Sequence, residues 1–176
     1  MDRTITTARL VLAPLVSDDV EALWRMLVLA DVRRYLCDDK VLPRSFVEGM
    51  AAANLTADGL GLFAIRDAEG FAGFVGIKPV SAEIAACIPA FRGELEVSVG
   101  LHPSRWGRGL AGEAVAAVLA QWRAHGDGRR VVAVADAPNV KSRRMLERAG
   151  FVAAGEHGGS AYPLVSYVPA GSTGTS

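Results

Sequence analysis

Residues 106–114 read WGRGLAGEA, and three glycines in this stretch have the spacing G-x-G-x-x-G. That spacing is typical of the turn that binds dinucleotides, where the backbone approaches a pyrophosphate at a helix N-terminus. The glycines are Gly107, Gly109 and Gly112, and residues 109–126 carry apolar side chains at helical spacing. The stretch therefore predicts a phosphate-binding turn at the start of a helix, and the residues around it indicate which ligand it binds.

The residues before the glycines differ from a dinucleotide-binding fold. The segment LHPSRW (101–106) separates the preceding strand from Gly107, whereas a dinucleotide turn directly follows its strand. That strand carries Glu94 and Glu96 on one face, whereas a parallel strand in a doubly wound sheet is apolar on both faces. Asp136 could serve as the ribose-binding acid, so an NAD(P)-dependent oxidoreductase stays as an alternative. A Walker loop is excluded because no Lys-Ser or Lys-Thr pair follows the glycines.

Outward from the glycines, hydrophobic periodicity predicts a chain of helices and strands. We expect helices at 17–36 (N-cap Ser17), from Ser45 (a capping box with Glu48) to about Ala57, at 109–126, and at 139–150 (capped by Asn139 and stopped by Gly150). We expect strands at 8–15, on both sides of the DAEG turn within 62–80, and at 93–102, 129–136, 151–156 and 162–168. The strands of 62–80 and 93–102 should form an antiparallel meander with short turns. This order predicts an α+β fold with a mixed sheet and helices on both of its faces.

The length and composition of the chain limit the classes of protein to which it can belong. The chain has 176 residues, 51% of them hydrophobic, so we expect one domain over residues 1–169, followed by a disordered tail at 170–176. Its 19 basic and 19 acidic residues cancel, which argues against a nucleic-acid or membrane-surface binder. The two cysteines, Cys37 and Cys87, fit no metal-binding or redox motif and are expected to be reduced thiols. The three histidines are scattered, and no signal peptide or membrane-spanning run is visible. We therefore expect a cytoplasmic protein without a metal site.

Two long segments, residues 93–122 and 129–151, resemble the GCN5-related N-acetyltransferases, the GNAT superfamily. The branch they resemble includes the ribosomal-protein N-terminal alanine acetyltransferases. The acyl-CoA-binding pattern Q/R-x-x-G-x-G/A of that superfamily corresponds to residues 106–111, with Trp106 at the first position. The later pattern N-x-x-S…LE…GF is matched by Asn139, Ser142, Leu146, Glu147, Gly150 and Phe151. The opening, residues 7–27, is similar to the branch's T-x-R-L-x-L-R-P-L start, with Ala13 where arginine is usual.

The resemblance implies a GNAT fold, in which the strand before the glycine loop splays from the next strand and the pantetheine arm of coenzyme A enters the opened wedge. It implies that backbone groups from Val99 to Leu101 contact pantetheine, and that the N–H groups from Arg108 to Gly112 hold the pyrophosphate. The residues it implies for acetyl-CoA binding are Val99, Leu101, Trp106, Gly107, Arg108, Gly109, Leu110, Ala111, Gly112, Asn139, Ser142 and Arg144.

Acetyl transfer to an amine needs a base, a donor to the carbonyl oxygen and a proton for the leaving thiolate. Glu96 is the first candidate for the base and Glu94 is the reserve, and a close carboxylate pair would raise one pKa toward neutrality. By resemblance, Ser142 protonates or hydrogen-bonds the leaving sulfur, and a backbone N–H near Val99 is the oxyanion donor. Two solvated glutamates and a serine bound to its own helix backbone are the alternatives for these residues.

We therefore expect an N-acetyltransferase that moves an acetyl group, or a longer acyl group, from acyl-CoA to a primary amine by direct attack. The acceptor is either a protein N-terminus or a small amine, and the sequence does not choose between them. By resemblance the first helices shape the acceptor pocket, with Trp24, Tyr35 and Phe46 as candidates. A catalytically silent CoA-binding regulatory module is a further alternative. Because dimers are frequent in the family, a homodimer is one expected assembly.

Overall fold

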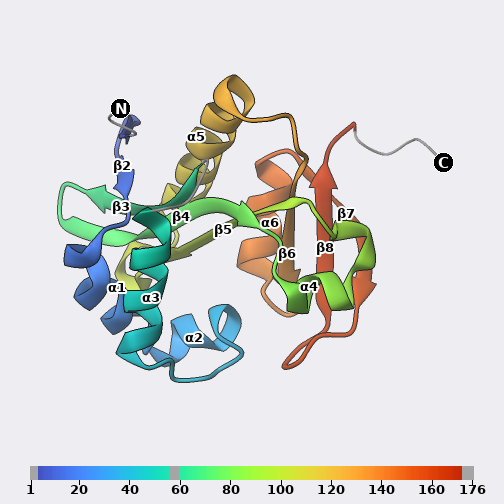
Figure 1. Ribbon diagram of the computed structural model, residues 1–176, viewed down its shortest axis with the longest axis horizontal. Helices are drawn as coiled ribbons and strands as arrows, with labels where there is room; N and C mark the ends of the chain where they lie inside the picture. The colour runs from blue at the N-terminus through green and yellow to red at the C-terminus, as the bar shows by residue number, and fades with distance from the viewer. Residues whose placement is uncertain (1–3, 56–59, 172–176) are drawn as a thin grey trace.

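The computed structural model describes residues 4–55 and 60–171, and within them one mixed sheet of eight strands runs through the molecule (Figure 1). The strands are β1 (Ile5–Thr6), β2 (Val11–Pro14), β3 (Gly61–Asp67), β4 (Gly70–Pro79), β5 (Leu95–Leu101), β6 (Val131–Asp136), β7 (Phe151–His157) and β8 (Leu164–Pro169). Their spatial order is β1-β2-β3-β4-β5-β6-β8-β7. Every neighbouring pair is antiparallel except β5 and β6. The α+β class, with a mixed and mostly antiparallel sheet, is confirmed.

Helices cover both faces of this sheet. They are α1 (Val20–Leu27), α2 (Ala30–Leu36), α3 (Arg44–Leu55), α4 (Ala82–Cys87), α5 (Leu110–His125) and α6 (Val140–Arg148), with 3₁₀ turns η1 (Ser17–Asp19), η2 (Pro89–Phe91) and η3 (Pro103–Arg105). Helices α5 and α6 pack on one face and share the largest hydrophobic core with β2–β6 and β8. Helices α1, α2 and α3 pack on the opposite face of β3 and β4, and α4 covers β6 and β8 on that same side. The alternation of side chains along each strand supplies both cores.

The predicted helix over 17–36 is wrong as a single element. It divides into η1, α1 and α2, because Leu29 adopts an extended conformation between α1 and α2. The Arg33 guanidinium donates to the Val28 carbonyl at 3.2 Å, so this oxygen, freed by the break, is satisfied. Ser17 is not the N-cap of α1, since Asp19 occupies that position and accepts a hydrogen bond from the Val16 N–H.

Two further differences concern the middle of the chain. Helix α3 begins at Arg44, so Ser45 lies inside it, and Glu48 pairs with Arg44 instead of closing a capping box. The expected end of this helix at 56–57 lies outside the described residues. Strands β4 and β5 pair as predicted, but they are joined through α4 and η2 and not by a short turn. The sequence signal for α4 was Ser81, whose hydroxyl accepts a hydrogen bond from the Ile84 N–H.

The strand order also decides against a dinucleotide-binding fold. Such a fold needs several parallel strands in succession, and this sheet has a single parallel neighbour pair. At the chain end, the Ala170 N–H donates to the Gly150 carbonyl at 2.9 Å. Residues 172–176 of the expected tail lie outside the described part of the chain.

Candidate active site

The sheet opens between its two parallel strands. Strands β5 and β6 pair only at Leu95–Val131 and Glu96–Val132, after which β5 continues beside β4 and β6 continues beside β8. From Val97 and Ala133 onward the two strands therefore separate and leave a wedge that opens toward their carboxyl ends. This is the splay that the resemblance implied.

The open edge of β5 presents backbone groups to this wedge. The Leu95 N–H donates toward β6, to the Arg130 carbonyl, whereas the His102 N–H donates to Ala72 on the β4 side. Because backbone groups alternate along a strand, the N–H groups of Val97, Val99 and Leu101 face the wedge. An extended amide-containing chain could therefore pair with β5 as an added strand. The Leu101 carbonyl is already occupied, because it accepts the indole N–H of Trp106 at 2.9 Å.

The glycine loop follows β5 and starts α5 as predicted. Gly107 and Gly109 have φ angles of +75° and +76°, a region that other residues adopt only with strain. Gly109 is the N-cap, and no side chain caps the helix there. The first intrahelical bond runs from the Glu113 N–H to the Gly109 carbonyl, so the amides of Leu110, Ala111 and Gly112 have no acceptor within the helix. Bare amides at the positive end of a helix fit a pyrophosphate.

Residues near the N-terminus of the chain hold the start of α5 in place. Glu113 accepts hydrogen bonds from the Thr7 hydroxyl at 2.6 Å and from Arg9 Nε at 2.7 Å. The Thr7 bond, followed by those from Arg9, holds the pKa of the Glu113 carboxyl below its ordinary value. Arg9 also donates to the Arg108 carbonyl at 2.8 Å. The T-x-R motif and the EA after the glycines thus serve one structural purpose, which is to position the loop.

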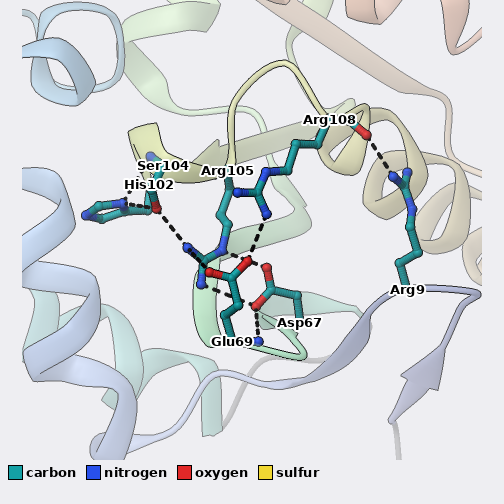
Figure 2. Close-up of polar contacts among 7 residues, drawn as sticks. All are labelled: Arg9, Asp67, Glu69, His102, Ser104, Arg105 and Arg108. Carbon is teal, nitrogen blue, oxygen red and sulfur yellow. Dashed lines mark hydrogen bonds and ion pairs between the residues drawn. The ribbon is translucent and has the colours of Figure 1, made fainter.

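A second set of ion pairs ties the loop to the β3–β4 turn (Figure 2). Arg105 Nε lies 2.6 Å from Asp67 Oδ2, and a further Arg105 nitrogen lies 3.3 Å from Glu69. Arg108 reaches the same Glu69 at 2.9 Å. Figure 2 shows the side chains of Arg105 and Arg108 converging on the two carboxylates. In this structure both cations are paired within the protein, so the loop offers its backbone amides for phosphate binding.

Helix α6 brings its first turn to the same place. Asn139 is its N-cap and accepts a hydrogen bond from the Ser142 N–H at 3.2 Å, as expected. Arg143 is occupied with the Tyr167 hydroxyl and the Ala137 carbonyl, whereas Arg144 is exposed. Lys141 lies over the Trp106 ring, 5.2 Å from its centroid, so Lys141 is a cation that α6 places beside the loop.

The two candidate bases have different surroundings. Glu96 is half-buried at the closed end of the wedge, in register with Lys78 of β4. Burial raises the pKa of the Glu96 carboxyl above its ordinary value, and the Lys78 ammonium offsets part of this. Glu94 precedes β5 and forms an ion pair with Arg130 at 3.0 Å. The perturbed pKa of Glu96 therefore arises from burial, and not from the repulsion by Glu94 that the sequence suggested.

Glu96 shares its face of the sheet with two further polar residues. Ser98 follows it on β5, and the Ser98 hydroxyl oxygen is buried without a hydrogen-bond partner among the described residues. Asp136 ends β6 on this same face, because Val132 and Val134 point away from α5 and α6. Asp136 is 8% exposed, and burial, followed by repulsion from Asp38, raises its pKa to about 6. The face opposite α5 and α6 therefore carries two carboxylates with raised pKa values, those of Glu96 and Asp136.

Two segments that are distant in sequence are joined by a hydrogen bond and a ring contact. The Ser160 hydroxyl in the β7–β8 loop donates to Asp38 after α2 at 2.5 Å, and the rings of Tyr35 and Tyr162 lie 5.5 Å apart. Of the other aromatic residues expected at the acceptor pocket, Trp24 packs against the α1–α3 core and Phe46 is 50% exposed.

The sequence matches the model of a known family over most of its length. The match is to the acetyltransferase (GNAT) domain, over residues 9–152. The chain belongs to the GNAT acetyltransferase family. No curated protein matches the sequence of this acetyltransferase.

Solved structures share its fold at low sequence identity. A Bordetella pertussis protein classed with the GNAT-family acetyltransferases is 23% identical, with a TM-score of 0.81, and the match covers 96% of this chain and 99% of that one. A Salmonella typhimurium acetyltransferase that modifies the N-terminal serine of ribosomal protein L7/L12 is 18% identical, with a TM-score of 0.72 and coverage of 94% and 97%. AAC(6')-Ib, solved with paromomycin and acetyl-CoA, is 15% identical, with a TM-score of 0.74 and coverage of 92% and 93%.

The described residues of this acetyltransferase contain no cluster of three or more His, Cys, Asp or Glu that could hold a metal ion. None of the helices described is both long and apolar enough to span a membrane. Asp136 at the end of β6 was expected from sequence only as a ribose-binding acid, and not as a carboxylate of the acetyltransferase wedge. Its signal was a lone carboxylate at the end of an otherwise apolar strand.

Proposed function

We propose that this acetyltransferase transfers an acetyl group from acetyl-CoA to a primary amine, which attacks the thioester directly within the wedge between β5 and β6. The separation of these strands beyond Glu96 and Val132 carries the proposal, because it leaves the β5 edge open beside an uncapped helix start. A pyrophosphate on the amides of residues 108–112 and pantetheine along Val99 and Leu101 fit this geometry. The amine then enters from the opposite face, where Glu96 lies.

The reaction needs one proton to leave the amine and one to reach sulfur. The amine nitrogen forms a bond to the thioester carbon, the C–S bond breaks, and the electron pair of that bond leaves with sulfur. We assign the amine proton to Glu96, directly or through water, because its raised pKa brings it nearer to neutrality. The wedge-facing N–H of Val99 is the donor to the carbonyl oxygen, and the Ser142 hydroxyl supplies the proton or hydrogen bond for sulfur.

Much of the rate enhancement in such a site comes from holding the two reactants together. The loop, positioned by Glu113 from one side and by Asp67 and Glu69 from the other, fixes the nucleotide end of the thioester substrate. The proposed acceptor is a small amine or a protein N-terminus; relatives of the fold act on both kinds of molecule, since one modifies a ribosomal N-terminus and another was solved with paromomycin.

The test combines binding and turnover. Acetyl-CoA should raise the melting temperature of the protein through ligand linkage, whereas NAD should not. Thiol release with acetyl-CoA should be measured over a panel of amines and N-terminal peptides. Glu96→Gln should lower kcat by about 100-fold, within the range for a general base, and should remove the acidic limb of the pH profile.

Glu94→Gln is the matched control, since Glu94 is engaged with Arg130 and leaves the base in place. If Glu94→Gln reproduces the loss and Glu96→Gln does not, the base assignment is overturned. If the protein binds acetyl-CoA but transfers to no amine, the proposed activity is overturned.

A further inference from the structure

Arg9 reaches the glycine loop from the N-terminal segment and ends on a backbone carbonyl. Its Nη1 donates to the Arg108 carbonyl at 2.8 Å (Figure 2). Its Nε and Nη2 lie 2.7 Å and 2.6 Å from Oε2 of Glu113. The same carboxylate accepts the Thr7 hydroxyl and the backbone N–H of Arg9. The guanidinium is therefore held in place by the first turn of α5, and it in turn holds one carbonyl of the loop.

The peptide unit between Arg108 and Gly109 converts this contact into the direction of an N–H group. The described residues contain no cis peptide bond. Because a trans peptide is planar, its C=O and N–H groups point in opposite directions. With the Arg108 carbonyl turned toward Arg9, the Gly109 N–H points away from the N-terminal segment. No described residue accepts that N–H, so it is free to bind a ligand at the start of α5.

Gly109 belongs to a run of amides that depends on such outside contacts. Among the described residues none accepts an N–H group of residues 107–112, whereas the Glu113 N–H already donates to the Gly109 carbonyl. Gly107 and Gly109 have positive φ angles and no side chain that could pack to hold them. The direction of the amides in this part of the loop is therefore set by what binds its carbonyls, and Arg9 binds one of them.

We propose that Arg9 is a positioning residue for acetyl-CoA, which orients the Gly109 N–H toward the pyrophosphate through the Arg108–Gly109 peptide. Arg9 acts without touching the substrate. Its effect depends on the planar guanidinium, whose separate nitrogens bind the Glu113 carboxylate and the Arg108 carbonyl at the same time. This inference rests on the proposed function, since it concerns the binding of the same thioester.

Arg9→Lys separates geometry from charge. It keeps the positive charge beside Glu113, but a single ammonium nitrogen cannot take the places of three guanidinium nitrogens. The dissociation constant for coenzyme A should rise about fivefold, the effect of one hydrogen bond of average net strength. Dephospho-coenzyme A, which keeps the pyrophosphate, should be weakened equally. The KM of S-acetylpantetheine, which has no pyrophosphate, should not change. Isothermal titration calorimetry and thiol release measure these quantities.

Two control variants distinguish this effect from general loosening. Arg25→Lys makes the same change at an arginine that also binds a glutamate through Nε, Glu21 at 2.6 Å, and should leave coenzyme A binding unchanged. Thr7→Val removes one hydrogen bond to Glu113 and leaves the contact between Arg9 and the Arg108 carbonyl in place. It should lower the melting temperature but raise the dissociation constant far less than Arg9→Lys does.

The surroundings of Arg9 also permit chemical rescue. A cavity of about 770 Å³ is lined by Arg9, Arg108 and Glu69, among other residues, so a small molecule can reach the space that a shortened side chain leaves. Arg9→Ala should lose affinity for coenzyme A and regain part of it in ethylguanidinium, but not in ethylammonium, which carries the same charge. Both salts are compared at equal ionic strength with the unmodified protein.

Several results would overturn the inference while leaving the acetyltransferase assignment intact. Unchanged coenzyme A affinity in Arg9→Lys would show that the loop needs no such contact. Weaker binding of coenzyme A but not of dephospho-coenzyme A would place the action of Arg9 on the 3′-phosphate. An equal effect of Thr7→Val, or an equal loss with S-acetylpantetheine, would indicate general loosening, and equal rescue by ethylammonium would indicate charge alone. Absence of coenzyme A binding to the unmodified protein would instead overturn the proposed function.

Discussion

Arg105 Nε lies 2.6 Å from Oδ2 of Asp67, and both side chains are only 11% exposed. The pair joins the segment before α5 to the turn between β3 and β4, residues separated by 38 positions in sequence. The Arg105 hydrogen bond is the main reason that the pKa of Asp67 lies below its ordinary value. Because Gly107 and Gly109 follow directly, this contact fixes the place at which the glycine turn begins.

Arg105→Gln is expected to loosen the glycine loop without touching the ligand. The dissociation constant for coenzyme A should rise about tenfold, equivalent to 1.4 kcal/mol of lost positioning, and the melting temperature of the free protein should fall. Isothermal titration calorimetry and thermal unfolding measure the two effects. Arg108→Gln is the control, since its pair with Glu69 is half-exposed and such pairs contribute little. An Arg105→Gln variant with unchanged affinity would show that the loop holds its shape without this pair.

The glycines of the loop should respond differently to the same substitution. Gly109→Ala places a side chain at a φ angle of +76° and should cost about 1–2 kcal/mol of unfolding free energy. Gly112→Ala meets only Met145 at an ordinary 3.9 Å inside a helix, so it should stabilise the free protein by about 0.4–1 kcal/mol. Both should weaken coenzyme A binding, because a methyl group would stand between the amides and the phosphates. Denaturant unfolding and calorimetry check each, and undiminished affinity in Gly112→Ala would contradict close approach at that amide.

The glycine loop and the cap of α6 were accessible from sequence because each depends on local signals, whereas the splay of β5 from β6 was implied only by the family resemblance. Gly107 and Gly109 are the residues that tolerate a positive φ, Asn139 is a preferred N-cap, and the glutamates on β5 mark a face that is not buried on both sides. Such signals act between residues that are close in sequence, so they can be recognised from the sequence alone.

The remaining features depend on contacts between distant segments. The break between α1 and α2 places Val32 in the second hydrophobic core, and Arg33 donates a hydrogen bond to the Val28 carbonyl that the break frees. No helix-breaking residue signals this break in the sequence. The pairing of Arg105 and Arg108 with the β3–β4 turn likewise could not be read from their neighbours in sequence. The burial of Asp136 follows from the insertion of β8 between β6 and β7, a strand order that periodicity does not specify.

The two roles expected at the start of α6 can be separated by mutation. Asn139→Ala removes the side chain that accepts the Ser142 N–H and should cost about 1 kcal/mol of unfolding free energy. Ser142→Ala keeps that N–H and should leave stability within about 0.5 kcal/mol, as for most changes away from packed or capping groups. If the Ser142 hydroxyl serves the leaving sulfur, Ser142→Ala should lower kcat with little change in KM for acetyl-CoA. A loss of stability in Ser142→Ala matching that of Asn139→Ala would assign the serine to the helix alone.

Asp136 should make the protein less stable as pH rises through the acidic range. Its pKa is raised from the ordinary 3.8 to about 6, so the folded state binds the proton more tightly than the unfolded state does. The stabilisation by protonated Asp136 is complete below about pH 4 and is lost as pH rises to about 6. At about 1.4 kcal/mol per pKa unit the upper bound is about 3 kcal/mol, and water at the mouth of the wedge should reduce it to about 1–2 kcal/mol.

Asp136→Asn removes this titration. Its advantage in unfolding free energy over the unmodified protein should be near zero at pH 4, grow up to about pH 6, and stay constant above it. The groups that act on Asp136 are Asp38 and, through Asp38, Lys40 and Ser160, so the experiment should be repeated in the Asp38→Asn background, where the advantage should shrink. Asp127→Asn is the control: hydrogen bonds from Arg129 hold the pKa of Asp127 below its ordinary value of 3.8, so Asp127 is ionised in both the folded and the unfolded state above about pH 5, and the difference between that variant and the unmodified protein should not change from about pH 5 to pH 8. Urea unfolding of the five proteins (the unmodified protein, the three single variants and the double variant Asp38→Asn/Asp136→Asn) from pH 4 to pH 8 measures these differences. An advantage of Asp136→Asn that does not vary with pH would show that Asp136 is not held in a desolvated site.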